Sequence, residues 1–187
     1  KLESICQNIN LLMNSNNNEV VKSLKINQDI LKKLQDDNLK HLKFQSSINT
    51  KIESVIRGVF IEYNLPLVGT AYADNETPKM FESYTNKNET YFVVTIDNVV
   101  EGGGGLKPLT AKDKDICEIQ KMYFSSNLRG KGFGKKLFLK CLEKAKALGF
   151  KQCYIETIPE LKEAIHIYRS NGFKHLNKPL GDTGHYN

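Results

Sequence analysis

The feature that most constrains the fold is a glycine-rich loop between an apolar strand and an amphipathic helix. The loop, Arg129-Gly130-Lys131-Gly132-Phe133-Gly134, follows a predicted strand over 116–124 and leads into a predicted helix over 132–148. Backbone amides at a helix start have no intrahelical acceptor, and the helix dipole adds positive charge there. Glycine permits positive φ and keeps side chains away from these amides. The loop is therefore predicted to hold an anion such as a pyrophosphate.

Four cations surround this loop: Arg129, Lys131, Lys135 and Lys136. A helix N-terminus disfavours each positive charge by roughly 0.3–1 kcal/mol, so a stable helix would carry Asp or Glu here. A bound polyanion would reverse that penalty. The local spacing alone equally allows a plain turn beside a solvated basic face.

Two other phosphate-binding classes fit the loop less well. A P-loop ends in Gly-Lys-Ser/Thr, whereas Gly134 is followed by Lys135 and Lys136. A dinucleotide-binding fold needs an acidic residue about twenty positions later, and Glu156 satisfies that spacing. The cations of the loop and the mixed-strand region upstream, which is not a repeating βαβ unit, disfavour that fold.

Elsewhere the patterns predict strands and helices of a mixed α/β (α+β) domain, a central sheet with helices packed on it. Strands are expected near Leu42 and Phe44, over 90–96, from Val99 after an Asp97-Asn98 turn, and over 152–156. Helices are expected over 52–63, over 78–84 with Thr77 as its cap, and over 159–170.

Residues 1–40 are predicted to form a separate helical segment, and residues 41–187 the main domain. Apolar residues recur at helical spacing in two stretches separated by the Asn-rich turn 14–18: Leu2, Ile5, Ile9 and Leu12, then Val20, Leu24, Leu31 and Leu34. An amphipathic helix pair needs a partner surface, so we expect a structural or oligomerising role, with a homodimer as one possibility. Because the sequence begins at Lys1, a remnant of a larger region is the alternative for this segment.

The net charge of +6 attracts anions, and nucleic acid, an anionic membrane and a polyphosphorylated cofactor all match it. The four cysteines, Cys6, Cys117, Cys141 and Cys153, form no CxxC pair, so neither a metal site nor a dithiol centre is expected. Free cysteines in apolar stretches are typical of a reducing compartment. With no membrane span or leader visible, we expect a cytoplasmic protein without a membrane partner.

Two motifs in order carry a resemblance to a known family. The pattern Arg/Gln-x-x-Gly-x-Gly/Ala is matched by Arg129, Gly132 and Gly134, and Ala-x-x-x-Tyr-x-x-x-Gly-Phe is matched by Ala164, Tyr168, Gly172 and Phe173. Together they resemble the GNAT superfamily of N-acetyltransferases over about 117–173, and more weakly from residue 41. The resemblance implies the GNAT fold with a mostly antiparallel mixed sheet, acetyl-CoA as co-substrate, no metal, and a small-molecule or protein amine as acceptor.

The resemblance also places the cofactor. The strand over 116–124 would separate from its neighbour and pair with the pantetheine arm, while the loop amides bind the pyrophosphate and Lys131 and Lys135 approach the phosphates. At Leu161 family members often carry Asn, so one polar contact is lost here. The implied cofactor-binding residues are Met122, Tyr123, Phe124, Arg129, Gly130, Lys131, Gly132, Phe133, Gly134, Lys135, Leu161 and Tyr168.

Two residues are implied as catalytic. Tyr168 would protonate the leaving CoA thiolate, or it is a core aromatic residue. Glu118 would accept the proton of the amine, directly or through water, or it is an ion-paired structural carboxylate. Strand alternation predicts Glu118, Gln120 and Met122 on one face and Ile119, Lys121 and Tyr123 on the other. Direct attack by the amine is expected, with the Met122 amide as the oxyanion donor.

The rest of the acceptor site is less defined. Tyr63, Tyr72 and Asp74 lie in a region that shapes it in this fold, and the glycines over 102–105 indicate a bulge or a close approach. The family's last strand is expected to be short or absent, and His166 and His175 to be surface or packing residues. The alternatives are a non-catalytic acetyl-CoA-binding module and the acetyltransferase part of a MarR-like regulator. Nucleic-acid binding is disfavoured, because the cofactor accounts for much of the basic cluster.

Overall fold

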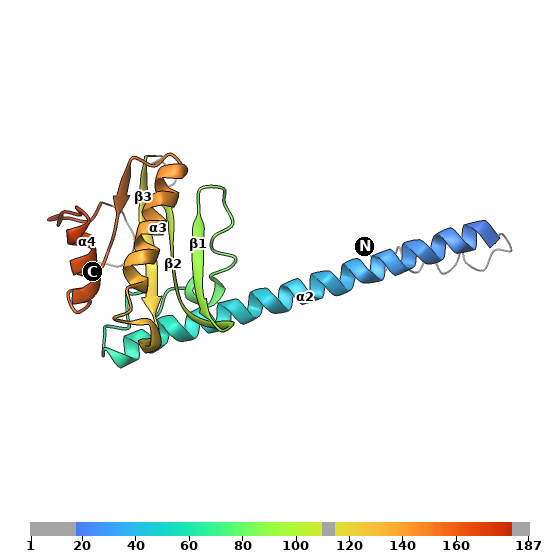
Figure 1. The fold of residues 1–187 in the computed structure, drawn as a ribbon, viewed down its shortest axis with the longest axis horizontal. Helices are drawn as coiled ribbons and strands as arrows, with labels where there is room; N and C mark the ends of the chain where they lie inside the picture. The colour runs from blue at the N-terminus through green and yellow to red at the C-terminus, as the bar shows by residue number, and fades with distance from the viewer. Residues whose placement is uncertain (1–17, 110–114, 181–187) are drawn as a thin grey trace. The chain divides into compact units, whose positions relative to one another are not determined.

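The computed structural model describes residues 18–109 and 115–180, which fall into two compact units that divide between Ser47 and Ile48. Helix α2 contributes to both units, and all other described elements belong to the second. In chain order they are α2 (Asn18–Glu62), η1 (Thr77–Lys79), β1 (Thr90–Ile96), β2 (Val99–Pro108), β3 (Ile116–Phe124), η2 (Ser126–Leu128), α3 (Phe133–Ala147), β4 (Gln152–Tyr154) and α4 (Lys162–Ser170) (Figure 1).

The predicted strand near Leu42 and Phe44 is wrong, because α2 runs through these residues without interruption. The two side chains are 53% and 60% exposed, so they are not the buried face of a strand. The stretch contains neither Gly nor Pro, and nothing in it ends the helix that the upstream periodicity predicts. Helix is confirmed over 20–38 and over most of 52–63, while the predicted helix and turn before Asn18 lie outside the described residues. The division at residue 40 stays a prediction.

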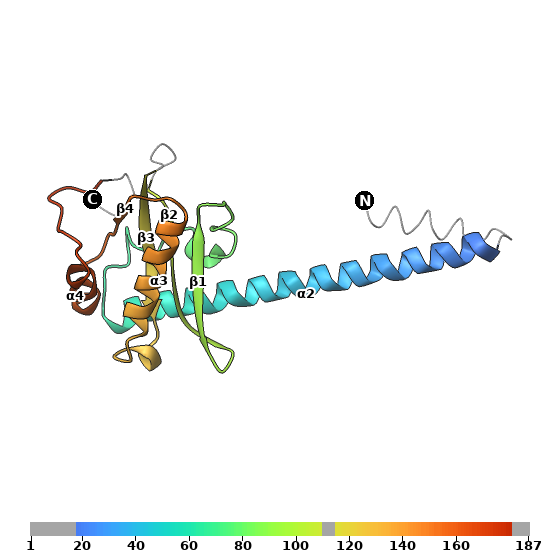
Figure 2. The ribbon, with the colours of Figure 1, turned by 45° about the horizontal axis from the view of Figure 1, so that its top comes forward.

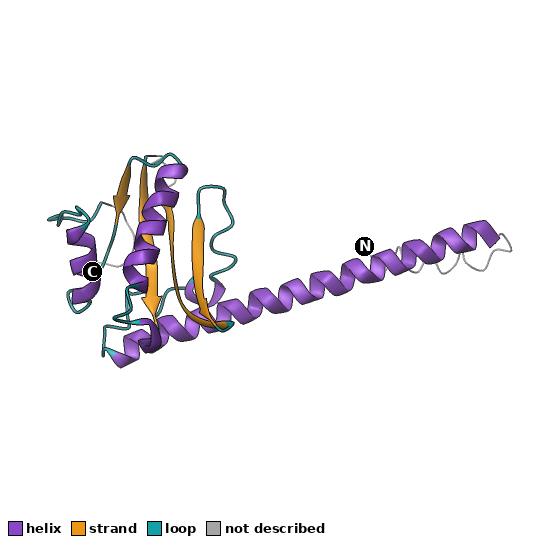
Figure 3. Cartoon of the chain, viewed as in Figure 1, coloured by secondary structure: helices purple, strands orange, loops and turns teal. Residues whose placement is uncertain are grey.

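The second unit contains one mixed, mostly antiparallel sheet with strand order β1-β2-β3-β4 (Figure 3). β1 pairs with β2 and β2 with β3 in antiparallel register, whereas β3 and β4 are parallel. The turn between β1 and β2 uses Asp97 and Asn98 at φ values of 49° and 63°, which suits these residue types in a tight hairpin. The predicted fold class is confirmed.

Helices pack on both faces of this sheet, and β1 shows how the alternation divides them. Tyr91 and Val93 point to the face covered by the last turns of α2, where the buried residues include Ile56 and Phe60. Phe92 and Val94 point to the opposite face, covered by α3 with its buried residues Leu137, Phe138, Cys141 and Ala145. Ile167 and Tyr168 of α4 join that second core. Two apolar layers thus hold the strands between helices.

Several predicted bounds were too long. Only a 3-10 turn, η1, forms where a helix was expected over 78–84, and Thr77 does not cap it: its buried hydroxyl donates to the Ala71 carbonyl at 2.6 Å. β4 ends at Tyr154, and α4 begins at Lys162. From Gly172 to Leu180 the described chain forms no strand, and the region where the last strand was expected to be short or absent lies outside the described residues.

The glycines over 102–105 lie in the middle of β2, where they make room for side chains from neighbouring strands. A Cβ at Gly103 would lie 2.6 Å from a Tyr91 ring carbon, and one at Gly102 would lie 2.7 Å from the Tyr123 carbonyl oxygen. The register of β2 with β3 shifts between Gly103 and Gly105. The predicted bulge is present, with its extra residue on β3 opposite Gly104, and the close approach comes from side chains and backbone carbonyls of the neighbouring strands.

Candidate active site

The bulge in β3 changes which side chains share a face. Gly103 pairs with Tyr123 and Gly105 with Gln120, so two residues of β3, Lys121 and Met122, oppose Gly104. The two-residue alternation is therefore broken at this point.

The face assignment predicted for the second half of this strand is wrong. Met122 packs in the core on the α3 side together with Ile119, whereas Tyr123 packs against the α2 side. The ammonium of Lys121 lies within 3.5 Å of the Gln120 amide oxygen, so Lys121 joins the face of Glu118 and Gln120.

β3 and β4 stay together for only a short distance. Their register pairs Ile116, Cys117 and Glu118 with Gln152, Cys153 and Tyr154, and in the described chain no β4 residue pairs with Ile119 or beyond (Figure 2). Met122, Tyr123 and Phe124 all lie in the part of β3 that has separated from β4. The predicted separation of the two strands is present, and it leaves one edge of β3 available to a ligand's amide groups.

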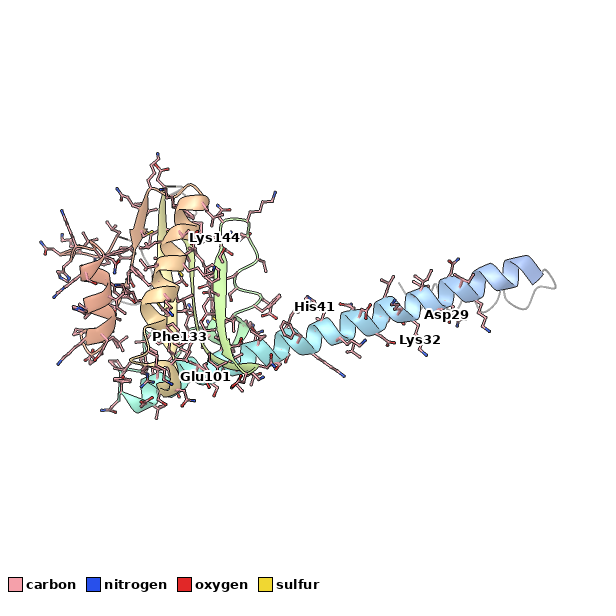
Figure 4. The ribbon with its side chains drawn as sticks, viewed as in Figure 1. Asp29, Lys32, His41, Glu101, Phe133 and Lys144 are labelled. Carbon is pink, nitrogen blue, oxygen red and sulfur yellow. The ribbon has the colours of Figure 1, made fainter. Side chains whose placement is uncertain are left out.

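The first turn of α3 has the open amides that the glycine loop predicts. Gly132 caps the helix with φ 78°, no side chain caps it, and the first turn carries no acidic residue. Lys136 is the first residue whose amide bonds back into the helix, to Gly132 at 3.1 Å. Within the described structure no backbone acceptor meets the amides of Gly130, Gly132, Phe133, Gly134 and Lys135. This set of donors fits an anion at the helix start, next to Phe133 in Figure 4.

Glycine is needed at Gly130 and Gly132 for conformation rather than for space. Their φ values are 70° and 78°, and a Cβ at either position would meet nothing within 4 Å. Lys131 and Lys135 are exposed beside these amides, where a phosphate could recruit them. Gly134 is different, since a Cβ there would lie 3.7 Å from both Ile167 and Phe124.

The side chain of Arg129 binds protein groups and does not point freely into the loop. Its Nη2 donates to Glu62 at 2.6 Å and its Nε to the Phe124 carbonyl at 3.2 Å, while its guanidinium lies 4.8 Å from the Tyr63 ring centroid. Arg129 can therefore serve the loop through its backbone and by anchoring, not through a free guanidinium. Tyr63 thus packs on the arginine of the glycine loop, and its predicted place near the acceptor stays a prediction.

Glu118 is a buried carboxyl with an altered pKa. It is 8% exposed, and its Oε2 accepts a hydrogen bond from Gln120 Nε2 at 3.0 Å. Burial and the nearby Glu156 carboxylate raise the pKa of Glu118 to about 7, while the Lys121 ammonium and the bond from Gln120 act in the opposite direction. A carboxylate of this pKa can accept a proton at neutral pH.

Charged residues surround this carboxyl on the α2 face of the sheet. Lys121 forms ion pairs with Asp74 and with Glu76, the latter at 3.2 Å. Lys107, opposite Glu118 on β2, pairs with Glu76 at 2.6 Å and lies 4.4 Å from the Tyr84 ring centroid. Asp74 is thus placed near the predicted base, whereas Tyr72 packs on Phe60 in the core.

Tyr168 lies on α4 against the core on the α3 side. Its ring centroid is 5.2 Å from that of Phe138 and 6.3 Å from that of Phe173. Burial, helped by the neighbouring Cys141, raises the pKa of Tyr168 to about 12, so the phenol keeps its proton at neutral pH. The Tyr168 phenol is also close enough to raise the pKa of Tyr123 on β3. Leu161, just before α4, packs against the α2-side core, and His166 and His175 are exposed.

Three residues near this site were not singled out by the sequence analysis. Glu62 binds Arg129 across 67 positions of sequence, and the hydroxyl of Tyr91 donates to the Lys121 carbonyl at 3.1 Å. Lys121 itself was placed on the wrong face. The glycines opposite β3 were the available signal for the bulge, but no local pattern names the residue that occupies it.

No helix within the described ranges is long and apolar enough to cross a membrane. Likewise, the described residues contain no cluster of three or more His, Cys, Asp or Glu side chains arranged to hold a metal ion.

Comparisons with known proteins identify the family. A family model described as the Acetyltransferase (GNAT) family matches residues 59–173. The Escherichia coli (strain K12) protein "Uncharacterized N-acetyltransferase YjgM" is 46% identical over 138 residues, covering 73% of this chain and 83% of that protein.

Solved structures show the same fold. A GNAT-family acetyltransferase from Staphylococcus aureus Mu50 superposes with a TM-score of 0.59 at 21% identity, over 70% of this chain and 79% of its own. A predicted acetyltransferase from Clostridium acetobutylicum, solved with acetyl-CoA, superposes with a TM-score of 0.53 at 18% identity, over 69% of this chain and 85% of its own. From the family match and the close relative, this chain belongs to the GNAT acetyltransferase family and is an acyltransferase.

Proposed function

We propose that the protein transfers the acetyl group of acetyl-CoA directly to a primary amine, with Glu118 as the general base and Tyr168 as the general acid. The family uses acetyl-CoA, and the proposal extends this to the residues that do the chemistry in this chain. The observation that carries it is the position of Glu118. A buried carboxyl with a pKa of about 7 lies on β3 at the last residue paired with β4, where the two strands begin to separate.

The cofactor would lie along the separated part of β3. Its pyrophosphate would accept hydrogen bonds from the open amides at the start of α3, with Lys131 and Lys135 as additional cations. Its pantetheine amides would pair with the free edge of β3 beside Met122 and Phe124. Both contacts use backbone groups, so the replacement of the family's usual Asn by Leu161 removes one side-chain contact only.

The reaction would proceed by nucleophilic addition and elimination. Glu118 takes a proton from the ammonium form of the acceptor, directly or through water, and the amine lone pair attacks the thioester carbonyl carbon. The Met122 amide stabilises the oxyanion of the tetrahedral intermediate. Collapse breaks the carbon–sulfur bond, and the CoA thiolate takes the phenol proton of Tyr168. The extra proton on the acetylated nitrogen then passes to the Tyr168 phenolate, which restores the phenol. The products are an acetamide and CoA.

The charges beside Glu118 favour a cationic acceptor. Asp74, Glu76 and Glu156 lie around the base, with the cations Lys107 and Lys121 among them. An ammonium group entering this site would be attracted by the carboxylates, and Glu118 could then remove its proton.

A CoA-release assay with a panel of amines tests the proposal. The panel includes polyamines, amino acids, aminoglycosides and a lysine peptide, each at several pH values, with acetyl-CoA hydrolysis alone as the baseline. We expect release above baseline for a cationic amine, with a rate that rises as the pH passes about 7. Tight acetyl-CoA binding without amine-dependent release would instead indicate a non-catalytic binding module.

A further inference from the structure

Lys121 occupies an unusual backbone position for a lysine. Its φ is 53°, inside a strand, whereas the other described non-glycine residues with positive φ are Asn64, Asp97 and Asn98, which lie in turns. Positive φ is unfavourable for a long side chain and persists only where the surroundings hold it. The strained residue coincides with the bulge between Gln120 and Tyr123.

The side chain of Lys121 is held by partners from a distant segment. The side chain is 5% exposed, and its ammonium pairs with Asp74 and, at 3.2 Å, with Glu76. Glu76 is also held by Lys107 of β2 at 2.6 Å. Removing one partner of a buried ion pair leaves an uncompensated charge, so this network ties the segment before η1 to the bulge.

The backbone of Lys121 is held separately. Its carbonyl oxygen accepts the hydroxyl proton of Tyr91, which comes from β1 across the β2 glycines. In a trans peptide the carbonyl and the following amide point in opposite directions. The Met122 amide is therefore directed away from the Tyr91 hydroxyl.

We propose that Lys121 is the positioning residue of this active site: its buried ammonium and its strained backbone together hold the Met122 amide and the Glu118 face in the arrangement that acetyl transfer needs. This inference rests on the proposed function for the roles of Met122 and Glu118. It adds a device that links the segment 74–76 to the reacting groups through one side chain.

The charged and titratable groups around Glu118 define what a change at Lys121 does to the pH dependence. They are Lys107 from β2, Lys121 from β3, Asp74, Glu76 and Tyr84 from the segment between α2 and β1, Tyr154 from β4, and Glu156 just after it. Loss of the Lys121 ammonium removes a cation that lowers the pKa of Glu118, while the carboxylates that raise it remain. The pKa of Glu118 should therefore rise.

Three variants distinguish the contribution of the Lys121 ammonium from that of the Lys121 backbone. Lys121→Met removes the ammonium and keeps the strain, Lys121→Gly removes both, and Tyr91→Phe frees the carbonyl without changing any charge. Lys151→Met is the matched control, because Lys151 forms an exposed ion pair with Asp115 at 2.8 Å, with a side chain that is 71% exposed. Each is measured for thermal stability, for the pH profile of kcat/KM with the best amine of the panel, and for amide exchange over 74–79.

We expect Lys121→Met to lose at least about tenfold in kcat/KM, with the acidic limb of the profile moved up by about one pH unit. Lys121→Gly should be more thermostable than Lys121→Met, because glycine accepts the positive φ, yet equally slow. Tyr91→Phe should lower kcat without moving the acidic limb of the pH profile. Amide hydrogen exchange of residues 74–79 should be faster in both Lys121 variants than in the wild type, and unchanged in Lys151→Met.

Two results would overturn the inference. One is full activity in Lys121→Gly, and the other is a folded Lys121→Met whose acidic limb lies at the same pH as that of the wild type. If the wild-type protein turns over no amine, the proposed function fails, and the exchange measurement still tests the attachment of 74–79. Unchanged exchange in Lys121→Met would then reject that attachment as well.

Discussion

Arg129 and Glu62 form a two-pronged ion pair that joins the loop before α3 to the last residue of α2. Nη2 of Arg129 lies 2.6 Å from Oε2 of Glu62, and Nη1 contacts Oε1 of the same carboxylate. This hydrogen bonding lowers the pKa of Glu62. The motif arginine is thus an anchor for the loop in this chain, and that role gives a first prediction.

Arg129→Lys should lower the melting temperature and raise KM for acetyl-CoA, because lysine keeps the charge but loses the planar fork and the bond to the Phe124 carbonyl. A carboxyl with a lowered folded-state pKa contributes stability above its unfolded pKa and loses it as the pH falls through the folded one. The stability difference between variant and wild type should therefore shrink in acid. Glu62→Gln supplies the double-mutant cycle, and strictly additive effects would contradict the pairing.

Glu118→Gln should abolish the acidic limb of the pH profile and lower kcat by roughly 100-fold or more, the usual range for loss of a general base. In the wild type, activity should rise as Glu118 loses its proton near pH 7. Because the folded-state pKa is raised, ionisation of Glu118 costs stability above its unfolded pKa. The variant should therefore melt higher than wild type at pH 8. A profile that keeps its limb near pH 7 would exclude Glu118 as the base.

Tyr168→Phe should lower kcat by about 100-fold if the phenol protonates the leaving thiolate. The melting temperature should change little, since the ring still packs on Phe138 and Phe173. With a pKa of about 12, Tyr168 should contribute no basic limb below pH 10. CoA release measured from pH 6 to 10 checks this, and unchanged turnover across that range would reject the assignment.

Gly132→Ala should destabilise the protein by roughly 1–2 kcal/mol, because alanine is strained at a φ of 78°. It should also raise KM for acetyl-CoA, since the same residue begins the helix whose amides are open. Gly58→Ala is the matched control: it lies inside α2, where an added Cβ meets nothing within 4 Å. Gly58→Ala should raise the free energy of unfolding, measured in urea, by about 0.5–1 kcal/mol and leave KM for acetyl-CoA unchanged. Equal effects of the two changes would contradict the conformational argument.

Cys153 should be the most reactive of the described thiols. Its Sγ lies 3.4 Å from that of Cys117, and the hydrogen bond from Cys117 lowers the pKa of Cys153. Burial raises the pKa of Cys141 to about 12, and the hydrogen bond with Cys153 together with burial raises that of Cys117. A time course with iodoacetamide in a Cys6→Ser background, read by mass spectrometry, should show Cys153 modified first. Equal rates at Cys141 and Cys153 would contradict this.

Local signals in the sequence were sufficient for much of the fold. The bounds of β1 and β3 were predicted as found, and those of α3 to within one residue at each end, because apolar alternation, helical spacing and glycine each act within a few residues. The strand predicted near Leu42 and Phe44 was wrong because two apolar residues without a two-residue period do not define a strand inside an unbroken run of helix formers. The short η1 failed because a proline start does not by itself supply the packing that extends a helix.

The amino-acid sequence by itself determined the loop from Arg129 to Gly134, with Gly130 and Gly132 at positions that need positive φ and with cations at a helix start. Tertiary structure alone decided what the side chains near it do. Arg129 binds Glu62. The bulge opposite Gly104 places Lys121 on the face of Glu118 and Met122 on the opposite face of the sheet. The reason is physical: a helix start depends on neighbours in sequence, whereas strand register and buried ion pairs depend on partners dozens of residues away.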